Sequence, residues 1–197
     1  MSTSISSDTA VMIFIRGLPG SGKSFLANAL VDKIDKNIII LDPDQTDYES
    51  DEYKAHTKKL IEEGVDSSLF EYRFLRAKAY EAITDNGTIV WSQPFTNLEI
   101  FKKMIGRMQD HALEQNTKLI ILIVEVNADP KIAKMRVKER KAAGGHGPSD
   151  EKFARFVNDF FTYGHLGYSI VTVDGTNDVS NSVSTIKSAL DLLSRIR

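Results

Sequence analysis

Cysteine is absent from the 197 residues, so the chain can form neither a disulfide nor a thiolate metal site. No apolar run approaches the roughly 20 residues that span a bilayer. Residues 1–9, rich in Ser and Thr, lack the basic start and apolar centre of a signal peptide. An excess of one charge is missing too, because 25 Lys and Arg face 27 Asp and Glu, and the net charge of −2 provides no general attraction for nucleic acid. These absences predict a cytoplasmic protein without a membrane partner, and they disfavour a nucleic-acid partner.

The pattern of apolar segments predicts an α/β fold. Five segments rich in Ile, Val and Leu are typical of buried strands: Val11–Arg16, Asn37–Leu41, Thr88–Ser92, Lys118–Val126 and Ser169–Val173. Helical patterns separate them, at Gly22–Ile34, Glu49–Glu63, Ser68–Asp85, Asn97–Asn116, Pro130–Ala142 and Ser180–Ile196. Such alternation indicates a parallel sheet covered by helices on both faces. We expect a flexible N-terminus over residues 1–10 and a single domain over residues 11–197, a length that can bury a substantial core.

One eight-residue segment, GLPGSGKS at residues 17–24, fits the phosphate-binding pattern G-x-x-x-x-G-K-[ST]. In this pattern the glycines let backbone N–H groups face phosphate oxygens, the lysine reaches the β and γ phosphates, and the final hydroxyl joins the shell of Mg²⁺. A chance match is the alternative, but an apolar strand precedes the segment and a helix follows it, as the pattern requires. The nucleotide-binding candidates are Gly17, Leu18, Pro19, Gly20, Ser21, Gly22, Lys23, Ser24 and Phe25.

Two acids, Asp42 and Asp44, follow the second expected strand in the sequence Leu-Asp-Pro-Asp. The carboxyl ends of parallel strands border the ligand crevice, where the phosphate loop also lies. One acid can accept a proton from an attacking hydroxyl, while the other helps to hold Mg²⁺ through water or orients the acceptor. A simple turn is the alternative, since Asp and Pro are common turn residues.

Two arginines, Arg136 and Arg140, are four residues apart and therefore share one helix face. Planar guanidinium groups suit the charge that spreads over a phosphoryl group during its transfer. The helix also carries several lysines, so a solvated basic face is the alternative. The breaker cluster GGHGP at residues 144–148 indicates the tip of a mobile lid at about residues 130–160, with Arg155 on the next helix. We interpret His146 in this tip as an exposed loop residue.

Weaker candidates come from the helical region before the third strand and from strand ends. Arg73 and Arg76 could contact an acceptor or its phosphate, although each fits an ordinary surface position. Gln93, after the third strand, could face the site, whereas Trp91 is expected in the core. The turn at residues 174–176 could border an adenine.

Together these residues resemble the P-loop kinases of small molecules, of the AAA_33 type, and within them the zeta-toxin-like and gluconate- or shikimate-kinase-like groups. The resemblance rests on GLPGSGKS, on LDPD, and on the Arg136 and Arg140 helix followed by GGHGPSDEKFARF. It implies a five-stranded parallel sheet of order 2-3-1-4-5, ATP with Mg²⁺ as phosphoryl donor, Asp44 or Asp42 as base, and lid arginines that clamp the phosphates. Two departures are the third strand end, Trp-Ser-Gln, where many relatives carry an acid, and the lack of an arginine shortly after LDPD.

We therefore expect an ATP-dependent kinase that phosphorylates a hydroxyl of a small molecule. In this reading Ser24 and Asp42 serve the metal, Lys23 bridges the β and γ phosphates, Asp44 accepts the proton, and the lid arginines close over the transferred group. The alternatives are a polynucleotide 5′-kinase, for which the charge is unfavourable, and a non-catalytic ATP-binding module, which the missing third-strand acid favours.

Overall fold

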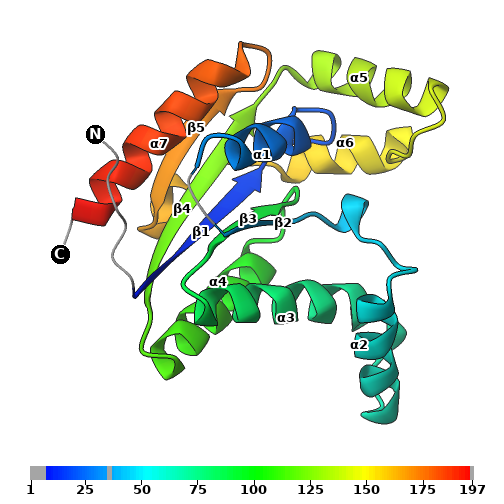
Figure 1. The fold of residues 1–197 in the computed structure, drawn as a ribbon. Helices are drawn as coiled ribbons and strands as arrows, with labels where there is room; N and C mark the ends of the chain where they lie inside the picture. Colours follow the sequence, from blue (N-terminus) through cyan, green and yellow to red (C-terminus); the bar gives the residue numbers. More distant parts are fainter. Residues whose placement is uncertain (1–7, 35–36, 196–197) are drawn as a thin grey trace.

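The computed structural model describes residues 8–34 and 37–195 as a sheet of five parallel strands with helices on both sides (Figure 1). The strands are β1 (Thr9–Arg16), β2 (Ile38–Leu41), β3 (Thr88–Ser92), β4 (Lys118–Asn127) and β5 (Ser169–Asp174). Their order in the sheet is β2-β3-β1-β4-β5, and each neighbouring pair is parallel. The α/β prediction and the order 2-3-1-4-5 are therefore confirmed.

The helices form a layer on each face of the sheet, and one of them, α2 (Asp51–Glu62), projects away from it (Figure 1). Their bounds are α1 (Lys23–Val31), α2 (Asp51–Glu62), α3 (Phe70–Thr84), α4 (Leu98–Glu114), α5 (Pro130–Ala142), α6 (Asp150–Asp159) and α7 (Val179–Arg195), with short 3-10 turns at Pro43–Gln45, Ser67–Leu69 and Gly164–Leu166. Helices α1 and α7 cover one face, and α3 and α4 cover the other. Helices α5 and α6 extend past the carboxyl edge of the sheet, where the lid was expected.

The central strand β1 divides the core into two halves because its side chains alternate between the two faces. Met12 and Phe14 pack among the side chains of α3 and α4. Val11, Ile13 and Ile15 pack with α1 and α7 on the opposite face. Burial of every residue of β1 explains its unbroken apolar sequence and fixes the position of the phosphate loop that follows it.

Element boundaries differ slightly from the expected ones. Strand β1 starts at Thr9, so residues 9 and 10 belong to the sheet, and residues 1–7 of the expected flexible terminus lie outside the described part of the chain. Helix α4 is capped by Asn97, whose side chain accepts a hydrogen bond from the backbone N–H of Ile100. The expected helical ranges at residues 49–63 and 68–85 are separate helices, and Gly64 between them has a positive φ of 71°.

The parallel arrangement brings the ends of all five strands, and the loops that follow them, to one edge. The phosphate loop follows β1 there, the two candidate acids follow β2, and α5 begins after β4. Among the helices that the described residues form, none is long and apolar enough to cross a membrane.

Candidate active site

The phosphate loop requires glycine at two positions with a left-handed backbone. Gly20 has φ of 83° and Gly22 has φ of 102°, a region that side chains disfavour. A Cβ atom on Gly20 would lie 2.2 Å from the carbonyl oxygen of Ala133 in α5. Glycine thus serves both the curvature of the loop and the close approach of α5.

The side chain of Lys23 folds back over the phosphate loop. Its Nζ donates a hydrogen bond to the carbonyl oxygen of Leu18 at 2.9 Å. Burial lowers the pKa of Lys23 to about 8, against the opposing effect of the Asp42 and Asp44 carboxylates, while Arg140 lowers it further. The site therefore holds a desolvated ammonium group whose positive charge anionic phosphates would stabilise.

Ser24 and Asp42 are in direct contact. The Ser24 hydroxyl donates to Asp42 Oδ2 at 2.8 Å, and Asp42 is buried at the end of β2. The second oxygen of Asp42 accepts the backbone N–H of Asp44 at 3.0 Å. A hydroxyl and a carboxylate oxygen side by side are donors that Mg²⁺ prefers, so these two residues fit the metal that the fold family uses.

Asp44 is exposed and has a different partner. Its Oδ2 lies 3.2 Å from Nε2 of His146, at the tip between α5 and α6, and both side chains are more than half exposed. Asp42 is therefore fixed beside Ser24, whereas Asp44 is directed into the open cavity. This difference in environment separates the two acids that the sequence left as alternatives for metal and base.

The two lid arginines both line the cavity from α5, but within the part of the chain that the structure describes only Arg136 is held by hydrogen bonds to neighbouring loops. Arg136 donates through Nη1 to the carbonyl oxygens of Gly175 at 2.8 Å and Gly20 at 3.4 Å, and so joins α5 to the phosphate loop and to the turn after β5. Arg140, one turn further along α5, lines the cavity. An apolar cluster that includes Leu18, Ala133, Val137 and Phe153 packs the lid helices against the phosphate loop.

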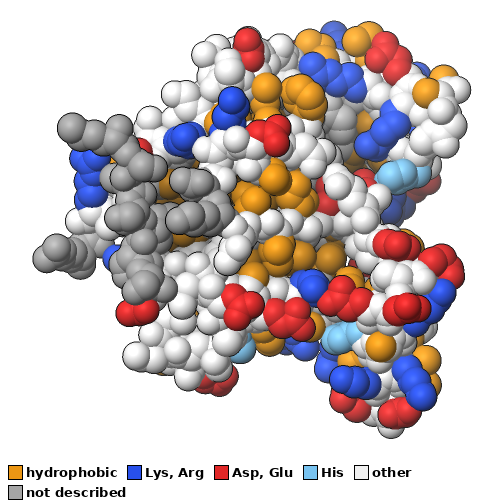
Figure 2. Space-filling model, viewed as in Figure 1, with side chains coloured by type: hydrophobic (Ala, Val, Ile, Leu, Met, Phe, Trp, Pro, Cys, Tyr) orange, Lys and Arg blue, Asp and Glu red, His pale blue; other side chains and the backbone are white. Residues whose placement is uncertain are grey.

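These groups surround a cavity of about 540 Å³ at the carboxyl edge of the sheet, in the size range of small-molecule sites. Figure 2 shows the surface hollowed between the lid helices and α2–α3, with acidic side chains along the α2–α3 side. Of the predicted site residues, those lining the cavity are Pro19, Gly20, Gly22, Lys23, Ser24, Phe25, Asp42, Asp44, Gln93, Arg136 and Arg140.

The remaining candidates lie elsewhere. Gly17, Leu18 and Ser21 belong to the loop but do not line the cavity. Arg155 borders an adjacent hollow of about 340 Å³ and pairs with Glu151 at 2.5 Å. Arg76 lies over the rings of Tyr72 and Tyr80 on its own helix, and neither it nor Arg73 lines these two cavities.

Several lining residues were not predicted from the sequence. Ser92, Pro94, Lys152 and Phe156 border the cavity. His146 is exposed in the loop, as expected, and it borders the cavity as well. The sequence signal for Ser92 and Pro94 was their position, because Ser92 ends the third strand and Pro94 follows it closely. The lid residues depend on how the tip folds back over the sheet, for which local sequence gives no rule.

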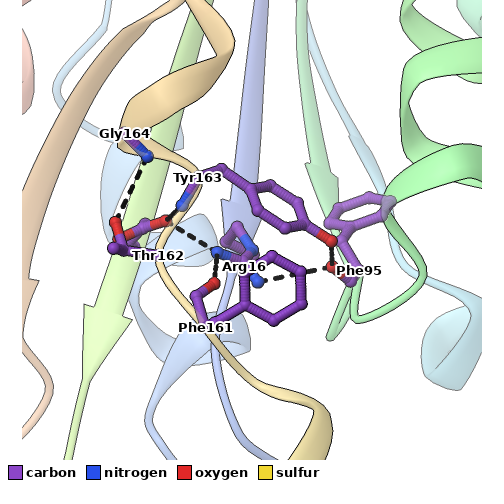
Figure 3. A network of polar contacts seen from close by, with 7 residues as sticks. Arg16, Phe95, Phe161, Thr162, Tyr163 and Gly164 are labelled. Carbon is purple, nitrogen blue, oxygen red and sulfur yellow. Dashed lines mark hydrogen bonds and ion pairs between the residues drawn. The ribbon is translucent and has the colours of Figure 1, made fainter.

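A buried network of polar contacts around Arg16 was also not predicted from the sequence (Figure 3). Arg16, the last residue of β1, is fully buried, and its Nη1 donates to Glu125 Oε1 of β4 at 2.6 Å. The same nitrogen donates to the carbonyl oxygen of Phe161 at 2.7 Å, and the guanidinium lies over the Tyr163 ring, 3.5 Å from its centroid. Burial lowers the pKa of Arg16, and the hydrogen bond with Glu125 opposes that shift.

The network connects the segment that follows α6 to the segment that follows β3 beside the cavity. Glu125 also accepts hydrogen bonds from the Thr162 hydroxyl and the Tyr163 backbone, both at 2.8 Å. The Tyr163 hydroxyl donates to the carbonyl oxygen of Phe95 at 2.5 Å. Phe95 has a positive φ of 47°, and it directly follows the cavity residues Gln93 and Pro94. A charged residue at the matching ends of two apolar strands was the sequence signal for this pair.

Comparison with known proteins agrees with this geometry. Residues 12–161 match the AAA_33 family, described as an AAA domain. No significant match was found among curated proteins.

Solved structures with the same fold include kinases. A gluconokinase from Sinorhizobium meliloti 1021 is 14% identical, with a TM-score of 0.55 over 95% of this chain and 94% of that one. A deoxyadenosine kinase from M. mycoides with bound dATP is 17% identical, with a TM-score of 0.54 over 91% and 98%. A structure of the PezAT toxin-antitoxin system of Streptococcus pneumoniae is 11% identical, with a TM-score of 0.59 over 96% and 89%. Because the family match covers residues 12–161 of 197, the chain belongs to the AAA_33 family of AAA domains, on a P-loop fold that it shares with small-molecule kinases.

Proposed function

We propose that the protein is an ATP-dependent kinase that transfers the γ-phosphoryl group to a hydroxyl of a small molecule. The observation that carries the proposal is the difference in environment between two acids at one strand end. Asp42 is held against Ser24 at 2.8 Å, on the metal side, and Asp44 is open to the cavity. A module that only bound nucleotide would need no second, exposed carboxylate at that point.

The cavity residues fit the roles that phosphoryl transfer demands. Lys23 and the loop backbone bind the phosphates, and Arg136 and Arg140 approach from α5 on the lid side. When bound, Mg²⁺ neutralises phosphate charge, and Ser24 with Asp42 would hold it directly or through water. Gln93, with its side chain half-buried in the cavity wall, is a further contact for the acceptor.

The proposed transfer balances without a covalent enzyme intermediate. The acceptor oxygen bonds to the γ-phosphorus as the bond between that phosphorus and the β–γ bridging oxygen breaks, leaving ADP. The proton of the acceptor hydroxyl passes to the Asp44 carboxylate. Lid side chains over the transferred group limit the access of water, which competes as an acceptor.

Support for a small-molecule acceptor comes from the size of the cavity and from the folds that the chain resembles. The names of two of those proteins, a gluconokinase and a deoxyadenosine kinase, identify small hydroxyl-bearing substrates. The lid sequence at residues 144–155 resembles that of zeta-toxin-like kinases, and this resemblance also supports the proposed kinase activity.

The non-catalytic ATP-binding module is the second candidate. It is favoured by one observation, namely that β3 ends in Trp91-Ser92 and is followed by Gln93 with no acid. Among the side chains that the structure describes, no group of three or more His, Asp or Glu is placed to hold a metal. Metal binding would then depend on Ser24, Asp42 and the nucleotide itself.

The test is ³¹P NMR of the protein with ATP, Mg²⁺ and a pool of sugars, sugar acids, nucleosides and nucleotide-sugars. A new phosphomonoester signal that is lost in Lys23→Ala supports the kinase, and its shift and coupling identify the acceptor class. ATP binding with no turnover across the pool would instead support the binding module. A short oligonucleotide included separately tests the polynucleotide 5′-kinase, whose activity would fall steeply with salt.

A further inference from the structure

The tip between α5 and α6 folds back against α5 through two close approaches that glycine permits. A Cβ atom on Gly145 would lie 2.8 Å from Cγ of Arg140 and 3.0 Å from its carbonyl oxygen. A Cβ atom on Gly147 would lie 2.9 Å from Cγ1 of Val137. Larger residues at these positions would push the tip away from α5. Glycine at both positions therefore permits the close packing of the tip against α5.

The tip carries His146 over the cavity. Nε2 of His146 lies 3.2 Å from Oδ2 of Asp44, which belongs to the opposite wall. Asp44 has no other side-chain hydrogen bond or ion pair with any residue that the structure describes. The contact therefore occupies the carboxylate that the proposed function assigns as base.

We propose that His146 determines specificity for the acceptor over water, by occupying Asp44 until an acceptor hydroxyl displaces it. This inference rests on the proposed function. A carboxylate open to solvent beside bound ATP could orient water instead of an acceptor. With His146 in contact, the imidazole occupies Oδ2 of Asp44 while no acceptor is present.

The reaction that the contact suppresses is ATP hydrolysis. A water oxygen would bond to the γ-phosphorus, the bond to the β–γ bridging oxygen would break, and the water proton would pass to Asp44. The products are ADP and inorganic phosphate. Suppression requires only that the His146 ring lies where the attacking water would contact Asp44.

The exposure of the two side chains makes the contact reversible. Side-chain exposure is 63% for His146 and 58% for Asp44, and exposed polar contacts of this kind are weak in water. An acceptor held by other cavity groups, such as Gln93, can therefore compete for the carboxylate. Water, which lacks those additional contacts, competes less well.

The experiment measures phosphate release from ATP and Mg²⁺ without an acceptor. His146→Ala should hydrolyse ATP roughly two- to fivefold faster than the wild type, the range expected for losing a weak exposed pair. His146→Gln, which keeps an N–H group near Asp44, should fall between the two. Lys138→Ala, an exposed change on α5 away from the cavity lining, should leave the rate unchanged.

A double variant separates the proposed cause from simple opening of the lid. If His146 acts by occupying Asp44, His146→Ala on an Asp44→Asn background should give no increase over Asp44→Asn alone. An increase that persists in the double variant would show that the tip excludes water by some other route, and would overturn the inference.

Binding measurements keep this result distinct from the proposed function. Calorimetry with ATP and Mg²⁺ should give similar affinities for the wild type and His146→Ala. If both bind ATP, and hydrolysis is no faster in the variant, the inference is wrong while the kinase proposal stands. Failure of the proposed function would appear as no acceptor phosphorylation in the wild type.

Discussion

Arg16 and Glu125 form a buried ion pair between two neighbouring strands, with Nη1 and Oε1 2.6 Å apart. The two residues are direct partners in the parallel register of β1 and β4. Arg16 comes immediately before the phosphate loop, and Glu125 holds the segment that returns from the lid. The pair therefore links the nucleotide-binding loop to the exit of the lid (Figure 3).

Removing one member of this pair should destabilise the protein strongly. Glu125→Ala leaves the Arg16 guanidinium buried without its carboxylate, which costs about 3–5 kcal/mol of unfolding free energy. Urea unfolding followed by circular dichroism measures the change. Thr162→Val is the matched control, because it removes only one of the hydrogen bonds to Glu125 and should cost about 1 kcal/mol. Equal stability of Glu125→Ala and the wild type would contradict this description of the network.

Gly20→Ala should abolish nucleotide binding. The added methyl group would collide with the carbonyl oxygen of Ala133 at 2.2 Å, in a backbone conformation that alanine disfavours. Calorimetry with ATP measures the loss. Gly106→Ala in α4 is the control, because nothing lies within 4 Å of its added Cβ. That control should bind ATP normally and gain about 0.5–1 kcal/mol of stability. Normal ATP binding by Gly20→Ala would refute the assigned loop geometry.

Nucleotide affinity should fall as the pH rises above about 8. The Lys23 pKa of about 8 in the nucleotide-free protein means that the ammonium form, which binds phosphate, is lost above that pH. Phosphates raise this pKa, so binding takes up a proton, and the dissociation constant should increase about tenfold between about pH 7 and about pH 9. Calorimetry in buffers of different ionisation enthalpy detects the proton uptake. Lys23→Met should bind weakly with no such dependence. An affinity that stays constant across this interval in the wild type would contradict the assigned role of Lys23.

Asp42→Asn should raise the Mg²⁺ requirement. Loss of the carboxylate that contacts Ser24 at 2.8 Å should increase the Mg²⁺ concentration for half-maximal activity by about 10- to 100-fold. ATP binding without Mg²⁺ should not weaken, because a negative charge near the phosphates is removed. Asp47→Asn, a nearby acid outside the cavity lining, is the control. An unchanged Mg²⁺ titration for Asp42→Asn would show that the metal is held without this residue.

Much of the fold follows from local sequence. The five strands could be predicted because a doubly covered parallel strand such as β1 must be apolar throughout, and α5 was predicted with its observed bounds because Pro130 begins it and glycines follow it. The phosphate loop could be predicted because its backbone geometry demands glycine at fixed spacing.

The unpredicted features depend on contacts between distant segments. His146 meets Asp44 only because Gly145 and Gly147 fold the tip back against α5. Arg16 and Glu125 meet through strand register, which depends on the assembled sheet. The different environments of Asp42 and Asp44 depend on the position of the Ser24 hydroxyl, which periodicity does not give.

The most direct test of the central claim is the stoichiometry of ADP and phosphorylated acceptor, measured by ion-exchange chromatography with the acceptor that the NMR pool identifies. The account predicts one phosphorylated acceptor for each ADP in the wild type. It also predicts a rate at least tenfold lower in Asp44→Asn, as expected when a general base is lost, with ATP affinity retained. ADP formation unaffected by any acceptor, or full acceptor phosphorylation by Asp44→Asn, would contradict it.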